Sequence, residues 1–266
     1  EFELIDNVSE VFHTAGKKVV VILNVGGVIE VASWRDKVDA ILLAWLPGQE
    51  AGNAIADILS AKVNPSGKLA TTFLKKYEDE SSSAKFPGKE YGQEITLGLR
   101  KVRLAEIEYS EGIYVGYRAF DKQKINPAYE FGFGLSYTDF DYRNLVLSSP
   151  EFRGEMKVNI TIKNTGQIPG REIVQVYLSA PGKTMDKPLQ ELKGFACTRL
   201  LRPDETQTLD FVLDARSLAS FDEKNAMWVS EKGDYTIRVG SSSRNIRLQA
   251  GFNLPEKIIV EKIKRD

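Results

Sequence analysis

The 266-residue sequence contains a single cysteine and a single histidine, and each scarcity excludes a class of site. Cys197 has no partner for an internal disulfide and cannot build a cysteine-rich zinc site. We expect it to be a small buried hydrophobe. His13 lies near the end of an expected helix, where a cation favours the last turn. One histidine so placed excludes a multi-histidine metal site and disfavours a Ser/His/Asp triad, so any catalysis would use carboxylates, lysine or tyrosine.

Long apolar runs and an excess of either charge are also missing. No run, Val19–Leu23 included, approaches the ~20 residues that a membrane helix needs. Lys and Arg number 36 against 37 Asp and Glu, which leaves none of the clustered positive charge that binds nucleic acids. We therefore expect no membrane and no nucleic-acid partner. No basic-then-apolar segment opens the sequence, and with no disulfide possible a cytoplasmic location is slightly favoured.

Residues 1–75 show the pattern of an α/β domain. Val19–Leu23 and Ala40–Trp45 are continuous apolar runs, typical of parallel strands covered on both faces. Apolar spacing predicts a helix over Phe2–His13, ended by Gly16. Further elements are expected as helices at Ile29–Trp34 and Asn53–Leu59 and as a strand at Leu69–Phe73. Two parallel strands are too few for a free-standing sheet, so this part resembles the C-terminal half of an α/β domain.

The rest of the sequence divides into three segments that differ in composition and in hydrophobic periodicity. Residues 76–139 are rich in aromatics and glycine, and we expect an extended connector that packs on other domains. Residues 140–255 carry about seven short strands with period-two alternation, separated by turn residues, which predicts an immunoglobulin-like sandwich. Residues 256–266 form a charged, amphipathic tail, expected as a peripheral strand or helix. The predicted fold class is thus α/β followed by all-β.

Four polar residues, at three places in the sequence, are considered for function. Gln49 and Glu50 follow a predicted parallel strand, at the sheet edge where open α/β sheets bind ligands; the alternative, which the pattern favours, is a helix N-terminal cap. Glu111 stands in an aromatic segment, where a salt bridge or a turn cap is the alternative to catalysis. Asn64 begins a turn in which its side chain is expected to bond its own backbone.

Several motifs together resemble glycoside hydrolase family 3. Those similar to the C-terminal α/β domain of the family are Lys18–Asn24, Ala44–Gly52, Asn64–Leu69, Tyr109–Arg118 and Phe131–Tyr137. Those similar to its fibronectin type III-like domain are Gly170–Tyr177 and Glu191–Phe195. The resemblance runs over nearly the whole chain in the order of the family, and bacterial β-glucosidases are the nearest likeness.

The resemblance implies a retaining β-glucosidase that acts on terminal non-reducing β-D-glucosyl residues, with no cofactor and no metal. The nucleophile of the family is an Asp in a Ser-Asp-Trp motif on a barrel, and this sequence has neither the motif nor the barrel. Ser33-Trp34-Arg35-Asp36 is only superficially similar to that motif. The acid/base Glu belongs to a Glu-Gly-x-Asp-Arg loop expected just before the first helix here. Glu111-Gly112 lacks the Asp-Arg, so no catalytic role is carried onto Glu111.

Two function classes follow. In the first, this chain holds no catalytic residue, is inactive alone and supports a barrel-bearing chain or segment of the same enzyme, with Gln49 and Glu50 facing the β-glucoside or oligosaccharide. In the second, it is a stand-alone carbohydrate-binding or structural module. An uncovered apolar face on the parallel strands would favour the first class. A planar row of exposed aromatics, Tyr109, Tyr114, Tyr117 and Phe120, would favour the second.

Overall fold

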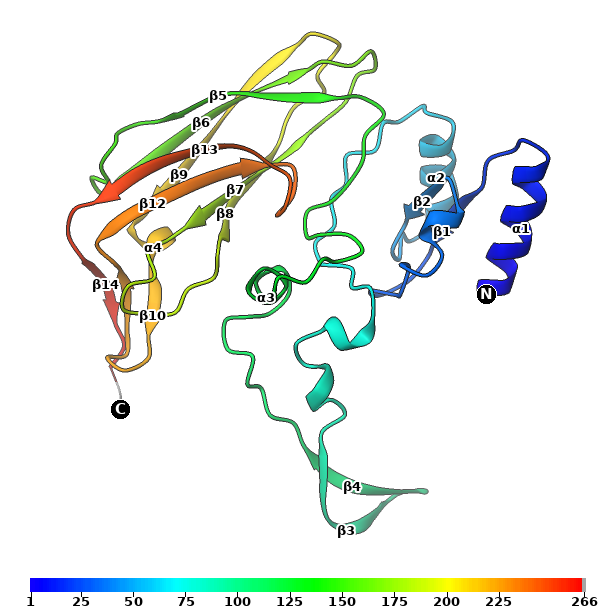
Figure 1. Ribbon diagram of the computed structural model, residues 1–266, viewed down its shortest axis with the longest axis horizontal. Coiled ribbons are helices and arrows are strands. Elements are labelled where there is room, and N and C mark those ends of the chain that lie inside the picture. Colours follow the sequence, from blue (N-terminus) through cyan, green and yellow to red (C-terminus); the bar gives the residue numbers. More distant parts are fainter. Residues whose placement is uncertain (265–266) are drawn as a thin grey trace.

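A helix and a two-stranded parallel sheet form the first part of the chain, as the sequence predicts. The computed structural model describes residues 1–264 and places α1 (Phe2–Thr14) beside β1 (Val20–Leu23) and β2 (Ala40–Leu43), followed by α2 (Ala51–Leu59) (Figure 1). The expected helix at Ile29–Trp34 is wrong: a turn leads instead into the short 3-10 helix η1 (Arg35–Lys37). The Glu30 carboxylate accepts bonds from the amide and hydroxyl of Ser33, and such side-chain bonds compete with helix formation.

The parallel sheet is covered on one face. Its inner face packs into a cluster built around Leu23, Val31, Trp34, Phe73 and Ala128, all of them buried. On the other side Val20 is 43% exposed and Ile22 is 40% exposed. The expectation that β1 is covered on both faces is therefore wrong within the described residues, because this side remains partly open to solvent.

The middle of the chain is irregular except for one hairpin. The strand expected at Leu69–Phe73 is wrong, since only a single bridge joins Phe73 to Tyr129. Two 3-10 turns, η2 (Tyr77–Asp79) and η3 (Ser83–Lys85), precede the antiparallel strands β3 (Lys89–Leu97) and β4 (Arg100–Glu106). Figure 1 shows this hairpin projecting away from the rest of the molecule. The short helix α3 (Tyr117–Gln123) follows and leads to the sandwich.

The last part is the predicted sandwich of seven strands in two sheets. The first sheet has the order β5-β6-β9 and the second the order β13-β12-β7-β8. Their bounds are β5 Phe140–Leu147, β6 Glu155–Asn164, β7 Ile173–Ser179, β8 Glu191–Cys197, β9 Thr206–Asp214, β12 Gly233–Gly240 and β13 Ile246–Leu254. Every second residue of β6 from Met156 to Ile162 is fully buried between the sheets. This alternation is the pattern that predicts a strand with one face in the core.

A small third sheet extends the sandwich. It contains β10 (Ser220–Asp222), β11 (Met227–Ser230) and β14 (Ile258–Lys262), and the short helix α4 (Ala215–Leu218) precedes it. The tail is thus a peripheral strand, and its residues 265–266 lie outside the described part. Cys197 ends the edge strand β8 and is exposed, so the expectation of a buried cysteine is wrong.

Polar side chains join the α/β part to the sandwich. Lys68 forms an ion pair of 3.1 Å with Glu172, and their side chains are only 11% and 7% exposed. Asn64 does not bond its own backbone as expected. Its Oδ1 accepts from the Tyr137 amide at 2.8 Å and its Nδ2 donates to the Pro169 carbonyl at 3.1 Å. Burial raises the pKa of Glu172 above its ordinary value, although Lys68 opposes the shift.

Candidate functional site

The carboxyl edge of the parallel sheet is formed by two loops that meet. The first follows β1, and a Cβ added to its Gly26 would lie 3.6 Å from the Leu46 side chain of the second loop. The second loop follows β2, and the Trp45 ring packs on Phe73 at 6.2 Å between centroids. Trp45 has a φ of 54°, which turns the chain sharply as it leaves the strand. The two strands thus position both loops on one edge, as parallel pairing requires.

Gln49 and Glu50 lie in the second loop and are both exposed. Glu50 is the residue before α2, but its side chain makes no capping bond to the helix backbone. Its Oε2 instead accepts a bond of 2.6 Å from the side-chain Nδ2 of Asn53. The Glu50 carboxylate is therefore held at the sheet edge while it remains open to solvent. A hydroxyl-rich ligand at this edge would meet an amide and a carboxylate, which can donate and accept hydrogen bonds.

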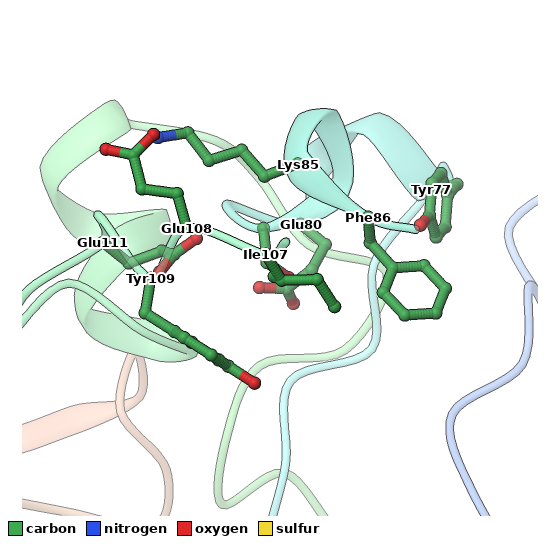
Figure 2. A pocket seen from close by; sticks show the side chains of 9 residues that line it. Tyr77, Glu80, Lys85, Phe86, Ile107, Glu108, Tyr109 and Glu111 are labelled. Atoms are coloured by element: carbon green, nitrogen blue, oxygen red, sulfur yellow. The ribbon is translucent and has the colours of Figure 1, made fainter. Parts of the chain in front are cut away.

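Glu111 lies at a separate cavity of about 190 Å³ between residues 77–86 and 107–111. Figure 2 shows Lys85 reaching the Glu108 carboxylate, with the Tyr109 and Phe86 rings also at the cavity. Lys85 Nζ lies 2.9 Å from Glu108 and also donates to the Ser110 hydroxyl. Tyr109 is 87% exposed, so its ring stands open to solvent. The cavity therefore combines aromatic faces with charged groups.

The structure does not bring the candidate residues into one site. Gln49 and Glu50 are absent from the cavity that Glu111 lines. Lys85 could not be predicted from the sequence, since a lone lysine in a polar stretch carries no signal until folding places it against Glu108. Asp36 is the acid of the segment that is superficially similar to Ser-Asp-Trp. Its side chain is 88% exposed and lies 3.5 Å from the Arg35 Nε. The cavity is lined by Glu80, Glu108 and Glu111, and Asp36 does not line it.

Two features of the described residues bear on the class of site. In the stretch from residue 1 to residue 264, histidine, cysteine and carboxylate side chains nowhere gather in a group of three that could hold a metal ion. None of the helices in that stretch is both long and apolar enough to cross a membrane. The sites that remain to be considered are the sheet edge and the aromatic cavity.

The aromatic residues between the two parts are mostly packed. Phe120 is 2% exposed, and the Tyr117 ring lies 5.0 Å from Phe131 and 5.9 Å from Tyr177. The Tyr117 hydroxyl accepts a bond of 2.9 Å from the Leu192 amide. These side chains fasten α3 to the sandwich. They do not form the planar exposed row that a stand-alone binding module would present.

Comparison with known proteins identifies both parts of the chain. Residues 2–137 match the model of the glycosyl hydrolase family 3 C-terminal domain, and residues 172–243 match that of the fibronectin type III-like domain. Beta-glucosidase B of Emericella nidulans is 41% identical over 229 residues, which cover 85% of this chain and 26% of that protein. Thermostable beta-glucosidase B of Acetivibrio thermocellus is 37% identical over 97% of this chain and 32% of its own length.

A solved structure agrees with these relatives over both parts. Beta-glucosidase 3B from Thermotoga neapolitana, determined in complex with α-D-glucose, matches with a TM-score of 0.88 and 47% identity. The match covers 97% of this chain and 34% of that protein, so the chain spans about a third of the length of its relatives. The matched region holds an α/β part followed by a sandwich, in the order that the sequence motifs predict. The chain belongs to glycosyl hydrolase family 3 and corresponds to its C-terminal and fibronectin type III-like domains.

Proposed function

We propose that this chain is the supporting part of a retaining β-glucosidase and works with a barrel-bearing chain or segment. Three similar proteins bear the name beta-glucosidase, and this chain spans between a quarter and about a third of each. The Ser-Asp-Trp and Glu-Gly-x-Asp-Arg motifs that carry catalysis in the family do not occur in the sequence. The nucleophile and the acid/base therefore come from the partner, and this chain alone turns over no β-glucoside.

One observation carries this proposal: the uncovered apolar surface of α1 and β1. Val20 and Ile22 of β1 are 43% and 40% exposed, and Leu4 and Val11 of α1 are both 66% exposed. Parallel strands in α/β proteins are normally buried on both faces. Removing apolar surface from water is favourable by roughly 25 cal/mol for each Å² buried, so leaving this surface exposed forgoes that free energy. A partner that completes the sheet would cover it, whereas a stand-alone module has no use for such a face.

In the proposed enzyme the partner performs the covalent chemistry. An aspartate bonds to the anomeric carbon as the glycosidic bond breaks, and the glutamate protonates the departing oxygen. The same glutamate then takes a proton from the water that hydrolyses the glycosyl-enzyme. The residues of this chain bind and support. Gln49 and Glu50 supply hydrogen bonds to sugar hydroxyls from the carboxyl edge of the sheet, and the sandwich braces the assembly through Lys68 and Glu172.

A pair of matched substitutions tests the uncovered surface. Val20→Asp places a carboxylate on the exposed face of β1, and Val212→Asp places one on the exposed face of β9, where valine is 58% exposed. The readout is the native mass of this chain mixed with the barrel-bearing segment of the Thermotoga neapolitana enzyme. We expect a complex with the parent chain and with Val212→Asp, and none with Val20→Asp. Equal complex formation by both variants would remove the support that this surface gives the proposal.

A further inference from the structure

Three aromatic side chains surround the cavity between residues 77–86 and 107–111. Tyr77, Phe86 and Tyr109 all line it, and they are 55%, 62% and 87% exposed. Aromatic side chains contribute most to folding and binding when their rings are covered, so three open rings around one cavity leave apolar surface for a ligand. Figure 2 shows the Phe86 and Tyr109 rings at this space with the Glu80 carboxylate between them. The cavity therefore offers flat apolar surfaces beside a charged acceptor.

The size of the cavity limits the ligand that it can hold. Its volume is about 190 Å³. Pockets for drug-sized ligands have volumes of roughly 300–1,000 Å³, so this cavity takes a smaller group. A single six-membered sugar ring is a group of this kind, and the rest of a longer saccharide would extend into solvent.

Both hydrogen-bond donors and hydrogen-bond acceptors line the cavity. Lys85 Nζ donates to the Glu108 carboxylate at 2.9 Å and to the Ser110 hydroxyl. Because an ammonium group has three N–H donors, one donor remains for a ligand. Glu80 and Glu111 line the same cavity, and ionised carboxylates only accept hydrogen bonds. A ligand that uses all of these groups must donate several hydrogen bonds and accept at least one.

The charges at the cavity distinguish between classes of ligand. Three glutamates and one lysine are among the described residues that line it, so a phosphate or a carboxylate would be repelled. A cation would be attracted by the glutamates, but it would share the cavity with the Lys85 ammonium, which Glu108 already holds there. A purely apolar ligand would deprive the carboxylates of water and give them no partner. A neutral ring that carries several hydroxyl groups avoids all three penalties.

We propose that this cavity binds one pyranose ring of a carbohydrate. The C–H face of the sugar packs against the Tyr109 and Phe86 rings. Its hydroxyl groups donate to Glu80 and Glu111, and one hydroxyl oxygen accepts from Lys85. Neighbouring hydroxyls suit this arrangement, because each of them can donate and accept. All of these groups belong to this chain, so the binding does not depend on the barrel-bearing partner of the proposed enzyme.

Titration of the full 266-residue chain with methyl β-D-glucopyranoside tests the proposal. Amide shifts in ¹H–¹⁵N NMR spectra give the dissociation constant, and the same spectra show whether each variant keeps the parent fold. We expect saturable binding that Tyr109→Ala weakens by about tenfold, since a ring that packs on the sugar is lost. The matched control is Tyr91→Ala. Tyr91 is 51% exposed but does not line the cavity, so binding is expected to stay unchanged.

A second pair of variants tests the polar contacts. Glu80→Gln keeps the size of the side chain but replaces a charged acceptor with a neutral amide, and we expect it to weaken binding by about fivefold. The matched control is Glu78→Gln, two residues away, exposed and outside the cavity, which is expected to leave the dissociation constant unchanged. Equal dissociation constants for these two variants would overturn the proposed contact with Glu80.

Three results would overturn the site as a whole. The first is the absence of saturable glucoside binding by the folded chain. The second is binding that Glu50→Ala abolishes and Tyr109→Ala leaves intact, which would place the sugar at the sheet edge. The third is tighter binding of tetramethylammonium than of the glucoside, lost in Tyr109→Ala, which would make the cavity a cation site. None of these results bears on hydrolysis by the assembled enzyme, so a failure of this proposal is distinguishable from a failure of the proposed function.

Discussion

Replacing Lys68 with methionine removes the cation from the ion pair that joins the α/β part to the sandwich. Methionine keeps the apolar stem of the side chain, so the main loss is the charge. Lys68 Nζ lies 3.1 Å from Glu172 and also donates to the Gly134 carbonyl at 2.9 Å. Both charged side chains are nearly buried, at 11% and 7% exposed. The substitution therefore leaves a carboxylate in a poorly solvated place without its partner.

The expected loss is about 3 kcal/mol in the free energy of unfolding at pH 7, the lower end of what removing one partner of a buried pair costs. Burial already raises the pKa of Glu172, and the loss of Lys68 raises that pKa further. The folded state then binds the proton more tightly than the unfolded state does. The stabilising effect of protonation is fully present below the ordinary pKa of 4.5 and is lost as the pH rises through the raised pKa.

Urea unfolding at pH 7 and pH 5, followed by far-UV circular dichroism, measures both effects. We expect the defect of Lys68→Met to shrink at pH 5, and Glu172→Gln in the same background to restore most of the stability at pH 7. The matched control is Lys62→Met, whose ion pair with Asp57 is largely exposed and whose loss is expected to cost about 0.5 kcal/mol or less. Equal losses for the two lysine variants at both pH values would refute the reasoning.

Two further predictions concern the α/β part. Lys18 and then the Val19 amide and His13 hold the pKa of Asp39 well below its ordinary value of 3.8; Asp39→Asn is expected to speed hydrogen exchange at Val19. The stabilisation by ionised Asp39 is present above pH 3.8 and is lost as the pH falls toward the lowered pKa of Asp39. If the exchange rates of the Val19 amide in the parent chain and in Asp39→Asn still differ in strong acid, the assignment is contradicted. In the assembled enzyme, Gln49→Ala and Glu50→Ala are each expected to raise KM for a nitrophenyl β-glucoside by about tenfold. The matched control is Glu78→Ala, at an exposed residue outside the sheet edge, and it is expected to leave KM unchanged. An unchanged KM in all three variants would exclude sugar contacts at the sheet edge.

Elements whose pattern comes from burial are the ones that the sequence predicts well. In β6 every second residue is buried from Met156 to Ile162, and the same alternation is visible in the sequence. Val20–Leu23 and Ala40–Leu43 pair in parallel as their continuous apolar runs predict. An apolar run predicts a strand but does not tell which element packs on its faces. The run looks the same whether the covering element belongs to the same chain or to another.

The β3–β4 hairpin was missed because its alternation is interrupted. The register shifts between Tyr91 and Ile95, where four residues of β3 span the place of two in β4. The residues at this irregularity, Gly92, Gln93 and Glu94, include no apolar side chain, so too few apolar positions alternate in β3 to predict a strand. The signal that predicts the hairpin is Gly98 at a turn, followed by a segment, Arg100–Glu106, in which apolar residues alternate with charged ones.

The candidate site was only partly predictable for a different reason. Gln49 and Glu50 follow from the rule that ligands bind at the carboxyl edge of parallel strands, and they do lie in the loop after β2. Asn64 and Lys85 act through partners distant in the sequence, Tyr137 and Glu108. No local pattern encodes such contacts, because the partners are chosen by the packing of separate segments.

The most direct test of the central claim is the rate of nitrophenyl β-glucoside hydrolysis by the purified chain, measured alone and with a barrel-bearing segment. We expect no turnover by the chain alone, and turnover that rises with the amount of complex when the segment is added. Hydrolysis by the chain alone, proportional to its concentration and abolished by Glu111→Gln but not by Glu108→Gln, would contradict it.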